Sequence, residues 1–160
     1  MTVLKHLSVD VLPKTLYHSS NYIATSVLKP GFEYTGKLVE WDEGESNKYL
    51  YATTDKEAAI SLGFASAIEH TYLLDGFHTD GDKIEIESPA KNLSLTDLQK
   101  LKVQLYTIKV EVGQDWIKNN NLTNHLDTEY KTDNHITNFS RQEVNMVEWL
   151  KDKNIKITTS

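Results

Sequence analysis

Alternating apolar and polar residues along the chain predict several short strands. Alternation of period two places every second side chain on the same face of a strand. The strongest pattern runs from Leu105 to Val112 and ends at Gly113. Weaker patterns of the same kind predict strands at 15–18, 48–53, 83–87 and 155–159.

Helical spacing predicts one long helix after the strand at 48–53. Thr54 can cap the first backbone N–H groups, and Glu57, three residues later, can bond back to Thr54. Gly63 weakens this helix relative to alanine. One face of the helix is apolar, which predicts packing against a sheet; its residues are Ala58, Leu62, Ala65, Ile68 and Tyr72.

The other segments are shorter or irregular. Residues 94–101 predict a short helix with Ser94 as its cap and Asp97 in its first turn. Residues 140–152 predict an amphipathic helix, whereas 32–47 predict an irregular excursion and 114–139 a helical turn around Trp116 followed by a long loop. The pattern favours an α+β fold of about six short strands in mixed or antiparallel sheets, with three or four helices.

Composition narrows the class of protein. A chain of 160 residues with 39% hydrophobic residues is expected to form a single domain over 1–160. The absence of cysteine excludes disulfides, thiol nucleophiles and thiolate metal sites. The six histidines show no spacing that would face one metal ion, so no metal site is predicted.

Charge and hydropathy limit the partners. The net charge of −6 argues against duplex nucleic acid, and Arg141 is the only arginine. No segment approaches the ~20 apolar residues of a membrane span, so no membrane partner is expected. Residues 1–11 lack the apolar run of a signal peptide, which predicts a cytoplasmic protein.

Two motifs carry the only specific chemical signal. The first is Leu16-Tyr17-His18-Ser19-Ser20, and the second is Tyr-Leu-Tyr-Ala-Thr-Thr-Asp-Lys-Glu-Ala-Ala at 49–59. Together they resemble the ADP-ribosyltransferase superfamily of the diphtheria-toxin and poly(ADP-ribose) polymerase type. In that branch one strand ends in Tyr-His-Gly-Ser/Thr, a second carries Tyr before a Lys-x-Ala helix start, and a glutamate comes late in the chain.

The resemblance implies that NAD is the cofactor, used as a substrate. His18 would hold a ribose hydroxyl of NAD and help to place the carboxamide, and Tyr51 would stack on the nicotinamide ring. Ser19 stands where the family has glycine, beside the carboxamide. The second stacking tyrosine of polymerase-type members has no counterpart, because Ile60 or Leu62 falls at its place.

Glu143 is the best-placed late glutamate for the catalytic position. Its carboxylate would stabilise the positive charge that develops as nicotinamide departs. The structural alternative is that Ser140 and Glu143 form a capping box at the start of the last helix. Glu129 and Glu148 are the other catalytic candidates.

Three functions follow from these patterns. The first is an ADP-ribosyltransferase-like enzyme that binds NAD and passes ADP-ribose to an unknown acceptor, such as a protein. The second is a catalytically inactive module of the same fold that binds NAD or a related nucleotide. The third is a small acidic phage or bacterial interaction protein whose charge of −6 attracts a basic protein partner.

Overall fold

The computed structural model describes residues 12–40, 46–119 and 129–159, and it has an α+β fold. The chain divides into two compact units. The first unit comprises 1–17, 24–56 and 107–140, and the second comprises 18–23, 57–106 and 141–160. The unit boundaries at 17/18, 106/107 and 140/141 fall within three strands. The predicted absence of a signal peptide concerns residues 1–11, which lie outside the described residues.

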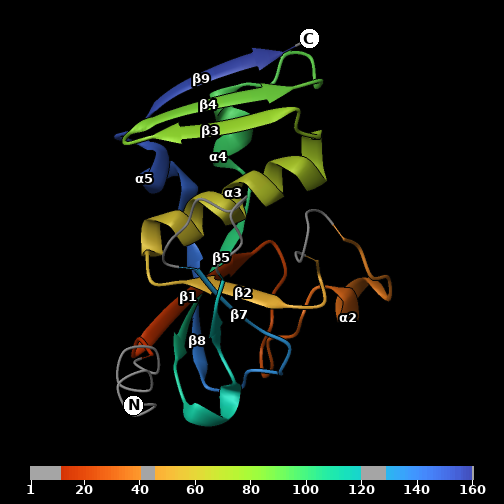
Figure 1. Cartoon of the computed structure of the whole chain (residues 1–160). Coiled ribbons are helices and arrows are strands. Elements are labelled where there is room, and N and C mark those ends of the chain that lie inside the picture. The colour runs from red at the N-terminus through yellow and green to blue at the C-terminus, as the bar shows by residue number, and fades with distance from the viewer. Residues whose placement is uncertain (1–11, 41–45, 120–128, 160) are drawn as a thin grey trace, which may run out of the picture. The chain divides into compact units, whose positions relative to one another are not determined.

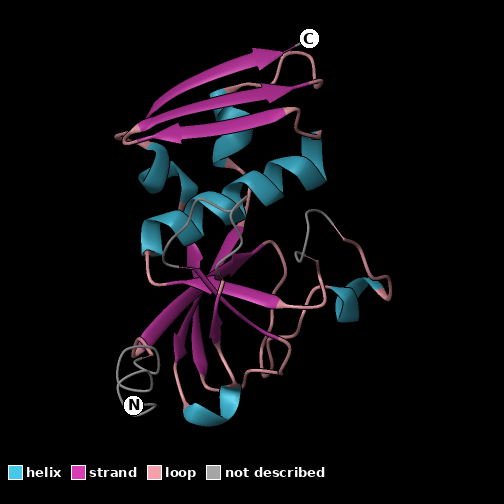
Figure 2. Cartoon of the chain, in the orientation of Figure 1, coloured by secondary structure: helices cyan, strands magenta, loops and turns pink. Residues whose placement is uncertain are grey.

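Six strands form an antiparallel sheet in the order β6-β7-β2-β1-β5-β8. Figures 1 and 2 show strands of this sheet. Tyr17 of β1 pairs with Thr53 of β2, and Leu50 of β2 pairs with Thr132 of β7. The two sequence motifs therefore lie on neighbouring strands. The strand bounds are β1 Thr15–Ser20, β2 Leu50–Thr53, β5 Val103–Lys109, β6 Ile117–Lys118, β7 Glu129–Thr132 and β8 Phe139–Val144.

The first unit also holds a one-turn helix, α2 (Phe32–Thr35), and a 3-10 turn at Val112–Gln114. Its buried hydrophobic side chains are aliphatic apart from Trp116, which is the largest. The indole Nε1 of Trp116 donates to Gln114 Oε1 at 2.7 Å, so this buried polar atom is satisfied. The buried aliphatic residues include Leu16, Leu28, Leu50, Ile108 and Ile136.

The second unit contains a three-stranded sheet in the order β3-β4-β9 (Figure 1). Strands β3 (Gly76–Asp80) and β4 (Lys83–Ser88) form a hairpin, whose two-residue loop begins with Gly81 at φ +62°. Glycine adopts this backbone conformation without strain. Strand β9 (Asn154–Thr159) pairs with β4 in parallel.

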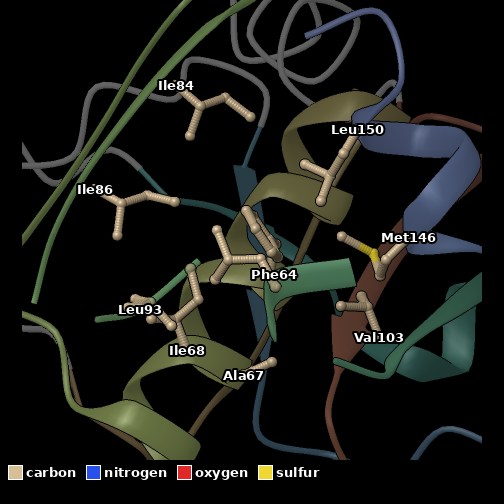
Figure 3. Packing of buried hydrophobic residues seen from close by; sticks show 10 residues of the cluster. Phe64, Ala67, Ile68, Ile84, Ile86, Leu93, Val103, Met146 and Leu150 are labelled. Atoms are coloured by element: carbon tan, nitrogen blue, oxygen red, sulfur yellow. The ribbon is translucent and has the colours of Figure 1, made fainter. Parts of the chain in front are cut away.

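The core of the second unit surrounds Phe64 of helix α3 (Lys56–Tyr72), as Figure 3 shows. Helices α4 (Leu95–Gln99) and α5 (Met146–Leu150) complete this core with strands β4 and β5. The indole of Trp149 packs edge-on against Phe64, and its Nε1 donates to Glu57 Oε2 at 3.2 Å. The other buried residues are Ala67, Ile68, Ile84, Ile86, Leu93, Leu98, Val103, Met146 and Leu150.

Gly63 brings helix α3 unusually close to strands β1 and β5. A Cβ atom at this position would lie 2.7 Å from Ser19 Cβ and 2.8 Å from Val103 Cγ1. Both distances are shorter than any ordinary carbon contact, so glycine is required for this packing. The hydroxyl of Ser19 also donates to the carbonyl oxygen of Ala59 on the helix.

Most predicted strands and the two earlier helices are confirmed. Strands β1, β2, β4, β5 and β9 and helices α3 and α4 overlap their predicted segments. The predicted apolar face of α3 is confirmed only at Ile68 and in part at Tyr72. It is wrong at Leu62, which is 51% exposed, whereas Phe64 is buried. Helix α3 begins at Lys56, however, so Asp55 rather than Thr54 precedes it. The predicted Thr54 capping box is wrong in this respect, and Glu57 instead contacts Trp149 and Lys153.

The C-terminal third differs most from the prediction. The predicted helix over 140–152 is confirmed only for Met146–Leu150, and its first part is wrong because β8 extends to Val144. Asn145 caps this helix by accepting from the backbone N–H of Glu148, so the predicted Ser140–Glu143 capping box is also wrong. The predicted loop over 114–139 contains β6 and β7.

Replacing Gly63 with alanine is expected to destabilise the protein by about 1–3 kcal/mol, because the new methyl group overpacks the contact with Ser19 and Val103. The cost exceeds the roughly 1 kcal/mol that alanine gains over glycine in a helix. Denaturant unfolding of Gly63→Ala, Ser19→Gly and the double variant measures the coupling. Gly113→Ala is the control, because no atom lies within 4 Å of its added Cβ. Equal stability of Gly63→Ala and wild type would contradict the contact.

The capping box of helix α4 makes stability depend on pH. The backbone N–H and then the hydroxyl of Ser94 hold the pKa of Asp97 below its ordinary value of 3.8. A lowered pKa in the folded state stabilises the fold at pH values above the ordinary pKa, and this contribution disappears as the pH falls through the folded pKa. Asp97→Asn is therefore expected to lower the melting temperature more at pH 7 than at pH 2. An equal decrease at both pH values would contradict this role.

Candidate functional site

Side chains alternate along β5, so its two faces have different surroundings in the second unit. Val103 points toward helix α3 and belongs to the hydrophobic core. Gln104 and Tyr106 therefore lie on the opposite face, two residues apart. Both are buried, with Gln104 1% exposed and Tyr106 0% exposed. A buried glutamine needs partners for both ends of its amide, so its neighbours define a polar site.

His18 of β1 shares this face with Tyr106. The side chain of the next residue, Ser19, points to helix α3, so strand alternation directs His18 away from the helix. The two rings lie 5.9 Å apart between centroids, tilted by 34°. The Tyr106 hydroxyl donates to the carbonyl oxygen of Tyr22 at 2.8 Å, which fixes the chain that follows β1.

Glu143 of β8 approaches the same face from the other side of β5. Gln104 Nε2 donates to Glu143 Oε1 at 3.0 Å, and Lys102 Nζ lies 4.0 Å from Glu143 Oε2. Arg141 Nη1 donates to Gln104 Oε1 at 2.5 Å. We call the side of strands β1, β5 and β8 that carries His18, Gln104, Tyr106, Arg141 and Glu143 the His18 face. It combines an imidazole beside Tyr106 with a guanidinium and a carboxylate that both bond to one buried amide.

Ser19 does not present its side chain on the His18 face. Its hydroxyl donates to the carbonyl oxygen of Ala59 in helix α3. The side chain of Ser19 therefore packs against helix α3, whereas the backbone of Ser19 lies next to His18 in β1. Of the two residues that the resemblance places at the missing second aromatic, Ile60 of α3 is buried, with 4% exposure, and Leu62 is exposed.

Tyr51 lies in the first unit, whereas His18, Ser19 and Glu143 lie in the second. Its hydroxyl donates to Ser46 O at 2.9 Å and accepts from Ser46 N at 3.1 Å. The ring is half-buried and meets Tyr49 edge-on, with centroids 6.2 Å apart. The hydroxyl is thus anchored in the backbone at one end of β2.

The two other candidate glutamates have different surroundings. Glu129 of β7 is buried, with 7% exposure, and accepts from Asn119 Nδ2 at 2.7 Å in the first unit. Glu148 lies on the exposed side of helix α5, where its backbone N–H is capped by Asn145. Glu143 is the one of these three carboxylates that belongs to the His18 face.

Within 12–40, 46–119 and 129–159, no three His, Asp or Glu side chains gather closely enough to hold a metal ion. No helix in these segments is long and apolar enough to cross a membrane.

Gln104 and Tyr106 are the site residues that the sequence did not single out. Both lie in or next to the strongest predicted strand, where an apolar pattern favours a purely structural interpretation. The available signal was the alternation of Val103, Gln104, Leu105 and Tyr106, which places a glutamine and a tyrosine hydroxyl on one buried face. Buried polar groups of this kind require partners, and those partners form the site.

The comparisons with known proteins give no family for the chain. No protein-family model matches it, and no curated protein or solved structure shows a significant match.

Proposed function

We propose that the protein is an ADP-ribosyltransferase-like enzyme that binds NAD on the His18 face and transfers ADP-ribose to an acceptor. The observation that carries this proposal is the common face of His18 and Glu143 in the second unit. His18 contacts Tyr106, and Glu143 is bonded to Gln104, two residues earlier on the same strand. The two residues that the resemblance assigns to ribose and to catalysis are thus both in contact with one face of β5, which supports the proposal.

The chemistry of this enzyme needs a carboxylate more than it needs a strong acid or base. The bond between the ribose C1′ and the nicotinamide nitrogen breaks, its electron pair leaves with nicotinamide, and positive charge develops on the ribose. The carboxylate of Glu143 would stabilise that charge and accept a hydrogen bond from a ribose hydroxyl. The acceptor then forms a bond to C1′ and loses its proton to solvent.

His18 would bind a second ribose hydroxyl. Its ring is supported by the buried ring of Tyr106, so its position on the face is restrained. A restrained donor or acceptor binds its partner at lower entropic cost than a mobile one. Ser19 would contribute its backbone beside the carboxamide, because its hydroxyl is bonded to helix α3.

Tyr51 retains the nicotinamide-stacking role that the resemblance implies. This part of the proposal rests on the sequence motif alone, since Tyr51 belongs to the first unit. The buried position of Ile60 in place of a second aromatic favours one alternative function, an inactive module that binds the nucleotide without cleaving it.

Incubation with NAD is expected to release nicotinamide, and the rate is expected to fall by about 100-fold or more in Glu143→Gln, because a neutral amide stabilises the developing charge less well. His18→Ala is expected to weaken NAD binding as well as turnover. Tyr51→Ala is expected to weaken NAD binding by about 1–2 kcal/mol through lost stacking. Nicotinamide release by chromatography and NAD affinity by calorimetry are the two measurements.

Trp149→Ala is the control, because it removes core packing next to Phe64 and is expected to lower stability without a selective effect on NAD. Binding of NAD without nicotinamide release would support the inactive module. No binding at millimolar NAD would reject both nucleotide functions and leave the acidic interaction protein.

A further inference from the structure

Arg141 and Glu143 carry opposite charges on one face of β8 and yet do not pair with each other. They are two residues apart on the strand, so their side chains project in the same direction. In the described part of the chain Arg141 forms no ion pair, and the cation nearest Glu143 is Lys102 at 4.0 Å. The Gln104 amide bridges them instead, with its Nε2 bonded to Glu143 and its Oε1 bonded to Arg141.

Burial makes Gln104 a fixed bridge. The side chain is 1% exposed, and both ends of its amide are used in these two hydrogen bonds. Rotating the amide would place its NH2 group against the guanidinium and its oxygen against the carboxylate, so both bonds would be lost. Gln104 therefore keeps the guanidinium and the carboxylate at two separate places on the His18 face.

The separation leaves a guanidinium available to an anion. A guanidinium has five N–H donors in a rigid fork, and the bond to Gln104 uses one of them. Arg141 and Lys102 give this part of the face two cations beside one carboxylate, although the chain as a whole carries a net charge of −6. The only arginine of the sequence thus stands beside the proposed catalytic carboxylate.

We propose that Arg141, oriented by the buried amide of Gln104, is a phosphate-binding residue of the site. A phosphate oxygen pair matches the fork of a guanidinium, and the bonds are strengthened by the opposite charges. The identity of the ligand rests on the proposed function, which supplies two sources of such a group: the diphosphate of NAD and a phosphate on the acceptor. The anion site itself is defined by Arg141, Gln104 and Lys102 without reference to turnover.

Calorimetric titration with inorganic pyrophosphate at low ionic strength tests the anion site directly. Wild type is expected to bind, and Arg141→Gln is expected to bind roughly 10-fold more weakly or worse, because charge-assisted hydrogen bonds are lost. Gln104→Met, which keeps the side-chain length but removes the bridge, is expected to weaken binding as well, because Arg141 can then pair with Glu143. Lys156→Gln removes the same charge from an exposed position on β9 and is expected to bind like wild type.

Three results would overturn the proposal: no pyrophosphate binding by wild type, unchanged binding by Arg141→Gln, or an equal loss in Lys156→Gln, which would indicate unspecific attraction. Thermal unfolding identifies any variant that does not fold. If Gln104→Met is such a variant, Arg141→Lys replaces it. Lysine keeps the charge without the fork, so binding intermediate between wild type and Arg141→Gln is expected, and binding equal to wild type would overturn the oriented-fork proposal.

Competition identifies the source of the phosphate. Displacement of pyrophosphate by NAD assigns Arg141 to the diphosphate of NAD, and simultaneous binding of both assigns it to a phosphate on the acceptor. Nicotinamide release is measured separately. Pyrophosphate binding that depends on Arg141 in a protein without nicotinamide release would reject the enzyme and keep the anion site. Nicotinamide release with unchanged pyrophosphate binding by Arg141→Gln would reject the anion site and keep the enzyme.

Discussion

Helix α3 approaches strands β1 and β5 at Gly63 so closely that no side-chain carbon fits between them. Ser19 and Val103 are the residues that meet the helix there, and the hydroxyl of Ser19 is bonded to its backbone. Because side chains alternate along a strand, this contact directs the neighbours of Ser19 and Val103 to the other face. The orientations of His18 and Gln104 both follow from it.

The two faces of these strands therefore differ in chemistry. The face toward α3 joins the apolar core around Phe64, which supplies stability by burying hydrophobic area. The His18 face carries polar groups, and the buried amide of Gln104 connects a guanidinium to a carboxylate. Burying an amide is costly unless both of its ends are bonded, so this network is expected to be specific in its geometry.

Local sequence patterns predicted those elements whose side chains alternate clearly or repeat at helical spacing. Strand β4 is the clearest example, because its alternating residues Ile84 and Ile86 also form part of the core of the second unit. Helix α3 was predicted as an element, but its predicted apolar face was not its buried face, since Leu62 is exposed and Phe64 is buried. Strand β8 was missed because its residues 140–143 are all polar. The Ser140–Glu143 spacing is also that of a capping box, which predicts the start of a helix. A polar strand at the edge of a sheet is held by its pairing with β5, which lies far away in the sequence.

In the candidate site, too, some residues were predictable from local sequence and others only from the tertiary fold. His18, Tyr51 and Glu143 were predicted from motifs and from position along the chain, and Glu143 also had a competing role as a helix cap. Its location in a strand removes that competing role. Gln104 could not be predicted as a bridge, because only the tertiary fold brings its amide between two residues of β8.

The central claim is that ligand binds to the His18 face and not to the face that packs on helix α3. An NMR titration of isotope-labelled protein with ADP-ribose, which lacks the bond to be cleaved, tests it most directly. The account predicts shifts of the Gln104 side-chain amide, the His18 ring protons and the Arg141 guanidinium signals, with no shifts at Ile84 and Ile86 in the core. Shifts confined to the core and the three-stranded sheet, or no shifts at millimolar ligand, would contradict it.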